Sequence, residues 1–202
     1  MQFFRFLFGQ SIGRLFYRGK YLKGRHFQSM EGIGWRWVTN CVLFQKIFGF
    51  NREVPWPVSP RIQVFGWQNI EFDNDDLNNF QTLGTYFQAI GAKIRIGKNT
   101  WIASNVGLIT ANHDFSDLNS HVPGQDIVLG RDCWIGINSM ILPGVTLGDH
   151  TIVGAGSVVT KSFPEGHCVL AGDPAGIIRR LPAFSRERFA SANTNAPDRR
   201  EP

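Results

Sequence analysis

The sequence has few of the residues that a disulfide framework or a metal cluster requires. Only three of its 202 residues are cysteine, and Cys41, Cys133 and Cys168 are widely separated. This spacing excludes a scaffold held by several disulfides and a zinc knuckle. No metal requirement is expected, and a reducing, cytoplasmic setting fits the cysteine usage.

Long apolar runs are also missing. No stretch approaches the roughly 20 residues needed to span a bilayer. The first ten residues, MQFFRFLFGQ, lack the charged start, long apolar middle and small-residue cleavage site of a signal peptide. Because 43% of the 202 residues are hydrophobic, one main domain with a substantial core is expected.

Acidic residues are scarce in the first quarter of the chain. Residues 1–52 hold nine Lys or Arg and one acid, Glu31, a net charge of +8 that leaves −3 for the rest of the +5 total. The same segment is rich in aromatic residues. We interpret residues 1–60 as a packed basic and aromatic cap, with peripheral contact to an anionic membrane as the alternative. No nucleic-acid-binding motif accompanies the charge, so nucleic acid is not an expected partner.

Residues 61–172 form a repeat region in which aliphatic residues recur every six positions from Ile90 onward, whereas the register is blurred before residue 90. A strand of period 2 or a helix of period 3.6 gives no reason for such spacing, whereas a solenoid with three six-residue sides does. Each aliphatic is expected to point to the solenoid axis, and the glycine that often follows it to permit the turn. The spacing therefore predicts an all-β solenoid. The recurring positions are Ile90, Ile96, Ile102 and Leu108, then Leu129, Ile135, Ile141, Leu147, Val153 and Val159.

Two segments depart from this repeat. Leu108 and Leu129 are 21 residues apart, which is not a multiple of six, so a loop excursion is expected over 109–127. Residues 173–202 begin with DPAGIIRRL, which we interpret as a short helix with Asp173 as its N-cap, followed by a polar tail.

The segment WIGINSMILPGVTLGDHTIVGAGSVVTKSFP, followed by AGDPAGIIRRL, resembles the hexapeptide-repeat acyltransferases. The likeness covers roughly residues 84–181 and is greatest to the maltose, galactoside and capsular polysaccharide O-acetyltransferase branch. The resemblance implies a left-handed parallel β-helix and a homotrimer with active sites between subunits. It also implies transfer of an acetyl group from acetyl-CoA to a hydroxyl of a sugar or glycan acceptor, in surface polysaccharide biosynthesis.

The same resemblance suggests catalytic residues. His113 opens the excursion in TANHD, where the family places the general base, and Asp114 is a candidate to orient it or to contact the acceptor. Galactoside-type relatives hold the oxyanion with an asparagine on an earlier coil. The matching segment, GTYFQAIG, contains no asparagine, so Gln88 is the expected substitute and Asn105 the alternative. His121 is expected only to pack within the loop.

The resemblance also places acetyl-CoA against the later coils. A tryptophan is expected beside the pantetheine arm, two small residues let the arm approach the coil, and three polar or basic residues meet the adenosine and phosphate end. Packing between coils is the alternative role for each, above all for Ala155. These positions are Trp134, Gly136, Ala155, Thr160, Lys161 and Arg179.

Two other functions remain open on the same fold. A γ-type carbonic anhydrase needs three zinc-binding histidines, but His113 and His121 are eight residues apart and no third histidine stands at a matching coil position. A non-enzymatic β-helix scaffold would explain the coils but not the joint presence of His113, Trp134 and the Thr160–Lys161 pair. The sequence therefore favours an acetyltransferase.

Overall fold

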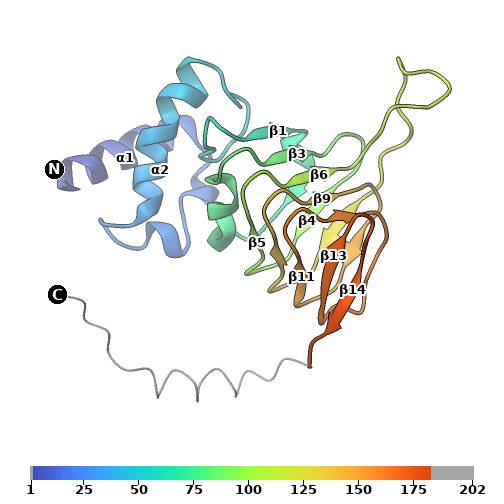
Figure 1. The fold of residues 1–202 in the computed structure, drawn as a ribbon. Coiled ribbons are helices and arrows are strands. Elements are labelled where there is room, and N and C mark those ends of the chain that lie inside the picture. Colours follow the sequence, from blue (N-terminus) through green and yellow to red (C-terminus); the bar gives the residue numbers. More distant parts are fainter. Residues whose placement is uncertain (1, 183–202) are drawn as a thin grey trace.

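The computed structural model describes residues 2–182, in which short strands wind into successive coils (Figure 1). Each complete coil contributes one strand to each of three sheets, named A, B and C here, and neighbouring coils pair in parallel. Sheet A contains β1 (Gln63–Phe65), β3 (Tyr86–Gln88), β6 (Gly107–Ile109), β9 (Met140–Ile141) and β12 (Val158–Val159). Sheet B contains β2 (Ile70–Glu71), β4 (Ile94–Ile96), β7 (Ile127–Leu129) and β10 (Thr146–Leu147). Sheet C contains β5 (Trp101–Ile102), β8 (Trp134–Ile135), β11 (Thr151–Val153), β13 (Cys168–Gly172) and β14 (Ala175–Arg180).

The expected aliphatic ladders form the solenoid core with one exception. Leu108 pairs with Ile141, and Ile102 with Ile135, and all four side chains are buried. Ile90, in contrast, is 44% exposed, so the expectation that it points to the axis was wrong. The inward position of that coil belongs to Phe87, which is in register with Leu108.

The glycines that follow the aliphatics have a different role from the expected one. Gly97, Gly130 and Gly148 are absent from the residues with positive φ. A Cβ on Gly130 would instead lie 2.6 Å from backbone atoms of Gly148 and Asp149 in the next coil. These glycines therefore allow adjacent coils to approach closely. Left-handed turn conformations occur at other positions, including Asn105 and Asn138.

The basic aromatic segment forms a helical cap on the first coil, and its helices were not predicted from the sequence. Its core contains buried aromatics such as Tyr17, Trp35 and Trp56, as expected for a packed cap. None of the helices in residues 2–182 has the length and apolar character needed to cross a membrane. The helices are α1 (Gln2–Phe16), η1 (Gly19–Tyr21), η2 (Arg25–Phe27), α2 (Ile33–Val42) and the π-helical η3 (Leu43–Ile47), followed in the first coil by η4 (Trp67–Asn69) and η5 (Asn74–Phe80).

The C-terminal helix predicted within 173–181 is wrong. Residues Ala175–Arg180 form β14, which pairs antiparallel with β13 and completes sheet C. Without β14, the last coil would expose the unpaired backbone groups of the edge strand β13. The β-branched Ile177 and Ile178 also favour a strand. Gly172, at φ 107°, makes the turn into this hairpin. The polar tail predicted after residue 182 lies outside the described residues.

Asp76 is a buried carboxylate where the cap meets the coils. Its Oδ2 accepts a hydrogen bond from the Asn99 backbone N–H at 2.8 Å, and the Arg25 guanidinium lies 3.6 Å from Oδ1. Burial raises the pKa of Asp76 to about 6 from its ordinary 3.8. The folded protein therefore binds this proton more tightly than the unfolded chain. The Asp76 contribution lowers the free energy of unfolding as the pH rises from about 4 to about 6.

We expect Asp76→Asn to raise the free energy of unfolding above pH 6 by about 1–3 kcal/mol, with little change below pH 4. The amide keeps an oxygen acceptor for Asn99 and never takes a charge. Urea denaturation at pH 4 and pH 7.5 measures the difference, with the exposed Glu165→Gln as the charge-matched control. A gain of equal size at both pH values would contradict the assignment of the shift to Asp76.

Candidate active site

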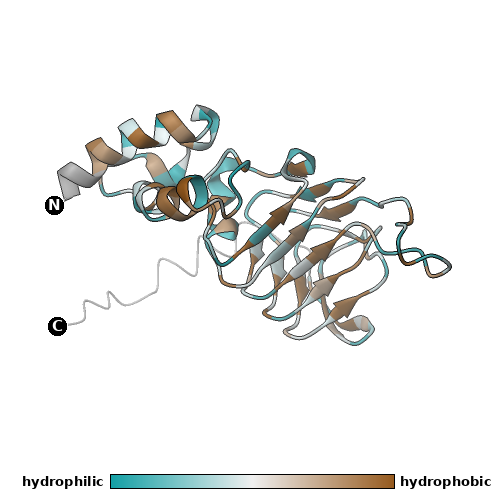
Figure 2. Cartoon of the chain, turned by 90° about the horizontal axis from the view of Figure 1, so that it is seen from above, coloured by the Kyte–Doolittle hydropathy of each residue, from teal (hydrophilic) through white to brown (hydrophobic). Residues whose placement is uncertain are grey.

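The interruption of the repeat is a hairpin-like excursion between β6 and β7, which projects away from the coils in both views (Figures 1 and 2). At its root, the Gln125 backbone N–H donates to the Thr110 carbonyl at 2.8 Å, and Thr110 Oγ1 donates to the Gln88 carbonyl at 2.9 Å. Farther out, the Val122 N–H donates to the Asn112 carbonyl at 3.0 Å. The excursion is thus fixed at its base to the preceding coil.

His113 is exposed on this excursion and is held in one orientation. Its Nδ1 lies 2.8 Å from the Leu118 carbonyl oxygen, which can only accept a hydrogen bond. Nδ1 therefore carries the hydrogen, and the neutral ring presents the lone pair of Nε2. His121 pairs with His113 in an isolated antiparallel bridge, and the two rings lie against each other at a tilt of 34° with centroids 4.2 Å apart. This arrangement provides an accessible base with a fixed tautomer.

The structure does not place Asp114 against His113. The Asp114 carboxylate accepts hydrogen bonds from the backbone N–H of Ser116 at 2.7 Å and from its hydroxyl at 2.5 Å. These bonds hold the pKa of Asp114 below its ordinary value. The group that orients the imidazole is the Leu118 carbonyl, so the orienting role considered for Asp114 is not seen.

The two amide candidates lie at opposite ends of the sheet A strands. Gln88 ends β3 beneath the excursion, and its Oε1 accepts from the Ala111 N–H at 3.5 Å, two residues before His113. Its side-chain N–H groups have no hydrogen-bond partner in residues 2–182. Asn105 occupies a left-handed turn before β6 and is separated from His113 by that strand. Of these two candidates, Gln88 is the one in contact with the root of the excursion that carries His113.

Trp134 lies on the outer face of sheet C. It is 57% exposed and stands in register with Trp101, which is 55% exposed. The Arg25 guanidinium lies 5.9 Å from the centre of the Trp101 ring. Sequence reasoning missed Trp101, although TWI and CWI, 33 residues apart, repeat the same pattern.

Arg179 lies on the same outer face as Trp134. Register pairs connect Trp134 to Ile152, Ile152 to Val169, and Val169 to Arg179. Residues paired in register point to the same side of a sheet, so an aromatic and an aliphatic surface ends at an exposed guanidinium.

The two small residues expected beside acetyl-CoA differ in role. A Cβ on Gly136 would lie 2.7 Å from the backbone nitrogen of Ala155 in the next coil. Glycine is therefore required at 136 for packing between coils. Ala155 is exposed in the turn after β11, where its methyl group leaves the surface open.

Thr160 and Lys161 follow β12 and are exposed at the bend that leads to sheet B. The Lys161 ammonium lies 5.7 Å from the centre of the Phe163 ring. The excursion with His113 occupies the corresponding bend between β6 and β7, on the same edge of the solenoid.

The candidate residues thus form two groups on different sides of one chain. His113, Gln88, Thr160 and Lys161 lie along the edge between sheets A and B, whereas Trp134 lies on sheet C. Sheet C is the side opposite that edge. Because packed sheets are about 10 Å apart, at least the width of the solenoid separates His113 from Trp134 of the same chain.

No cluster of three or more His, Cys, Asp or Glu side chains suited to a metal ion occurs in the described part of the chain. The rings of His150 and His167 contact each other at a tilt of 39° with centroids 5.0 Å apart, remote from the excursion. The structure thus brings no third histidine to the pair at 113 and 121.

Comparisons with known proteins agree with the coiled fold. Residues 126–161 match the family model described as bacterial transferase hexapeptide (six repeats). A Dictyostelium discoideum protein, provisionally named an acetyltransferase, is 40% identical over 144 residues, which are 70% of this chain and 73% of that protein. A provisionally named colanic acid biosynthesis acetyltransferase of Escherichia coli is 29% identical over 184 residues, 86% of this chain and 95% of that one. A provisionally named acetyltransferase of Saccharomyces cerevisiae is 40% identical over 95 residues, and the match spans 47% of its length.

Among solved structures, a galactoside acetyltransferase in complex with coenzyme A shares the fold. Its TM-score is 0.51 at 22% sequence identity, with 90% of this chain and 86% of that chain covered. The solenoid is accordingly a left-handed parallel β-helix. The six-residue ladders and the 40% identity over 73% of the Dictyostelium protein support the same family. The chain belongs to the hexapeptide-repeat acyltransferase family.

Proposed function

We propose that the protein is an acetyl-CoA-dependent O-acetyltransferase that acts on a hydroxyl of a sugar, within a surface polysaccharide or its precursor. The observation that carries the proposal is His113, whose Nδ1 is bound to the Leu118 carbonyl so that Nε2 is free to act as a base. The galactoside and colanic acid names of the relatives support a saccharide acceptor.

The reaction needs a base, donors for the developing oxyanion, and a bound thioester. His113 Nε2 takes the hydroxyl proton as the sugar oxygen forms a bond to the thioester carbonyl carbon. The carbon–sulfur bond then breaks, and the thiolate leaves with the proton from the imidazolium. The amide N–H of Gln88 is placed to donate to the oxyanion. Trp134 and Arg179 of one chain provide the pantetheine and phosphate contacts, and Thr160 and Lys161 of the chain that supplies His113 meet the adenosine end.

We further propose a homotrimer in which His113 of one chain meets Trp134 of a neighbour. Two observations support this arrangement. The two residues lie on opposite sides of one chain, and the tip of the excursion carries large apolar side chains, with Phe115 96% exposed and Leu118 69% exposed. A neighbouring copy would cover this tip.

A thiol-release assay tests the activity directly. Purified protein with acetyl-CoA should release coenzyme A only when a saccharide acceptor from a panel of galactosides, N-acetylhexosamines and capsular oligosaccharides is added. Mass spectrometry should show one added acetyl group on the acceptor. A protein that binds no acetyl-CoA and acetylates no member of the panel would instead favour the scaffold alternative.

A second proposal concerns the cap, which we infer to dock on an anionic membrane surface. Helix α1 packs on α2 through the buried Gly9 and Gly13, which face Trp35 and Val38. Its opposite face exposes Leu7 at 47% and Leu15 at 75%, and hydrophobic colour covers much of this helix (Figure 2). Apolar side chains beside a net charge of +8 are the features of an interfacial helix.

Vesicle flotation tests this docking. Wild-type protein should float with vesicles that contain phosphatidylglycerol and not with phosphatidylcholine alone. The double variant Leu7→Gln/Leu15→Gln should lower recovery about 10-fold, because two exposed leucines no longer enter the interface. Ile178→Gln, 67% exposed on β14 at the other end of the solenoid, is the matched control. Equal recovery of wild type and the double variant would refute the docking.

A further inference from the structure

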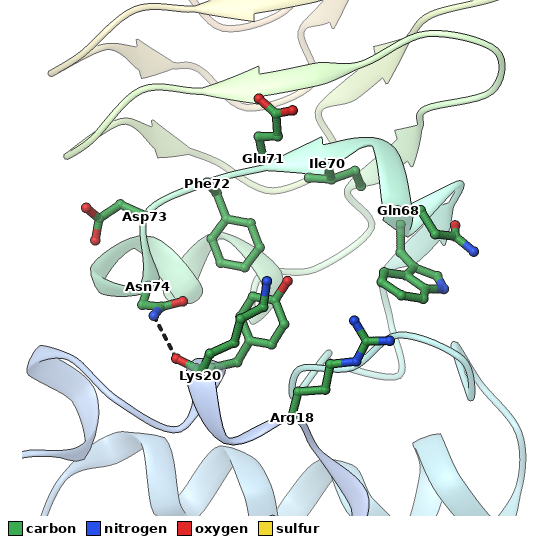
Figure 3. A pocket seen from close by; sticks show the side chains of 10 residues that line it. Arg18, Lys20, Gln68, Ile70, Glu71, Phe72, Asp73 and Asn74 are labelled. Atoms are coloured by element: carbon green, nitrogen blue, oxygen red, sulfur yellow. Dashed lines mark hydrogen bonds between the residues drawn. The ribbon is translucent and has the colours of Figure 1, made fainter.

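A cleft of about 730 Å³ separates the cap from the first coil (Figure 3). Residues from both parts line it, and the view shows Arg18 and Lys20 extending from the cap toward β2. Its size is that of a site for a small ligand such as a sugar. The lining residues are Arg18, Lys20, Tyr21, Trp67, Gln68, Ile70, Glu71, Phe72, Asp73 and Asn74.

The acidic residues of this cleft are already paired with the following coil. The Glu71 carboxylate lies 2.6 Å from Lys93 Nζ and 3.3 Å from Arg95 Nε. The Asp73 carboxylate lies 3.3 Å from Lys98 Nζ. These contacts neutralise the two carboxylates on the coil side.

The two cations on the cap side have no such partner. The Arg18 guanidinium lies 5.2 Å from the centre of the Trp67 ring, and Lys20 Nζ lies 4.6 Å from the centre of the Tyr21 ring. Within residues 2–182, neither side chain forms an ion pair. Stacking on aromatic rings restricts both cations while their charge stays uncompensated, which favours an anionic ligand.

Groups suited to hydroxyls lie beside these cations. Asn74 Nδ2 donates to the Lys20 carbonyl at 2.7 Å, as Figure 3 shows, and this bond leaves Asn74 Oδ1 as a free acceptor. The Gln68 side-chain amide makes no hydrogen bond to another described residue. A ligand with both an anionic group and hydroxyls therefore matches the cleft.

The cleft lies on the same edge of the solenoid as His113. Its η4 turn is the bend between β1 and β2, and Asn69 Nδ2 in that turn donates to the Ala89 carbonyl of the next coil at 2.9 Å. The bend at 89–93 in turn approaches the excursion, where a Cβ on Gly91 would lie 3.7 Å from the Gly124 nitrogen. The cleft and the root of the excursion are thus two coils apart, about 10 Å at the usual strand spacing.

We propose that this cleft binds an anionic sugar unit of the acceptor, with Arg18 and Lys20 on its phosphate or carboxylate and Gln68 and Asn74 on its hydroxyls. The inference rests on the proposed acetyltransferase function. Binding a remote unit here would hold the acceptor chain while another hydroxyl reaches His113.

Calorimetric titration without acetyl-CoA tests the binding separately from catalysis. The probes are glucose 6-phosphate, glucuronate, glucose and inorganic phosphate. Glucose 6-phosphate or glucuronate should bind at least about 10-fold more tightly than glucose and more tightly than inorganic phosphate. The better of the two charged sugars identifies phosphate or carboxylate as the anionic group. Equal affinity for glucose and both charged sugars, or tighter binding of inorganic phosphate alone, would overturn the proposal.

Variants locate the site. Arg18→Gln and Lys20→Gln should each weaken the charged sugar about 5- to 10-fold, because each removes one charge and keeps most of the side chain. Lys23→Gln removes an exposed charge of the same cap outside the lining and should bind as wild type does. Thermal unfolding confirms that all three variants are folded. Wild-type affinity in both cleft variants, or an equal loss in Lys23→Gln, would overturn the site.

The two proposals fail in distinguishable ways. If His113→Ala abolishes acetyl transfer but the charged sugar still binds, both the catalytic and the cleft assignments stand. If acetyl transfer occurs and none of the four probes binds, the cleft proposal is wrong while the enzymatic function stands.

Discussion

Replacement of His113 by Ala should lower kcat by about 10²- to 10⁴-fold, the usual contribution of a general base. The substitution removes Nε2 of the ring whose tautomer the Leu118 carbonyl fixes. His121 lies against this ring, but on the other strand of the excursion and with no such hydrogen bond to another described residue. Acetyl-CoA affinity, measured by calorimetry, should stay within about twofold, because the donor contacts are assigned to other residues.

Two further variants separate the base from the shape of the loop. In His113→Asn the side-chain amide can still donate to the Leu118 carbonyl, but no base remains, so it should be as inactive as His113→Ala. His121→Ala removes the neighbouring ring and keeps the base, so its loss of activity should be below about 10-fold. If His113→Asn regained wild-type turnover, the histidine would only hold the loop, and its assignment as the base would be wrong.

The sequence predicts the solenoid because its ladder positions are fixed by stacking between coils. The ladder from Leu129 to Val159 keeps steps of six because each coil side has the same length. Nine residues separate Phe87 from Ile96, so three extra residues in that bend move Ile90 to the surface. Ile90 still lies six residues before Ile96, so it matches the spacing of the ladder even though Phe87 takes the inward position.

Elements outside the repeat were harder to predict. The segment at 175–180 becomes a strand because β13 offers an open edge, and that edge exists only in the folded coil. The cap helix α1 has apolar residues around its whole circumference, so its sequence shows little helical periodicity. The sequence pattern of a single segment does not show which other segments it contacts in the fold.

The candidate site was predictable where it depends on residue type. His113 was chosen as a histidine at the interruption of the repeat, at the position where the family that the sequence resembles places its base. Its orienting partner was not, because the Leu118 carbonyl belongs to the backbone and any residue supplies one. The division of the site between two sides of the chain requires knowledge of which strands share a sheet.

That division leads to a complementation experiment. Suppose one variant lacks the base, as His113→Ala, and a second lacks donor contacts, as Trp134→Ala/Arg179→Ala. Each alone should lose at least about 10²-fold in activity at subsaturating acetyl-CoA. If each site takes its base from one chain and its donor surface from a neighbour, random mixing in equal amounts gives about one wild-type site in four. Co-expressed and co-purified mixtures should therefore regain about a quarter of wild-type activity.

A second mixture makes the test independent of how strongly each variant is impaired. Wild-type chains mixed equally with chains that carry all three substitutions should retain about a quarter of the activity if sites are shared, and about half if each chain holds a complete site. Both chains carry the same affinity tag, so the whole random mixture is purified and assayed and these fractions apply. Activity near half in this mixture, with no recovery in the first, would place base and donor contacts in the same chain. That result would contradict the separation of His113 and Trp134 across the solenoid, because no single rigid β-helix brings opposite sides together.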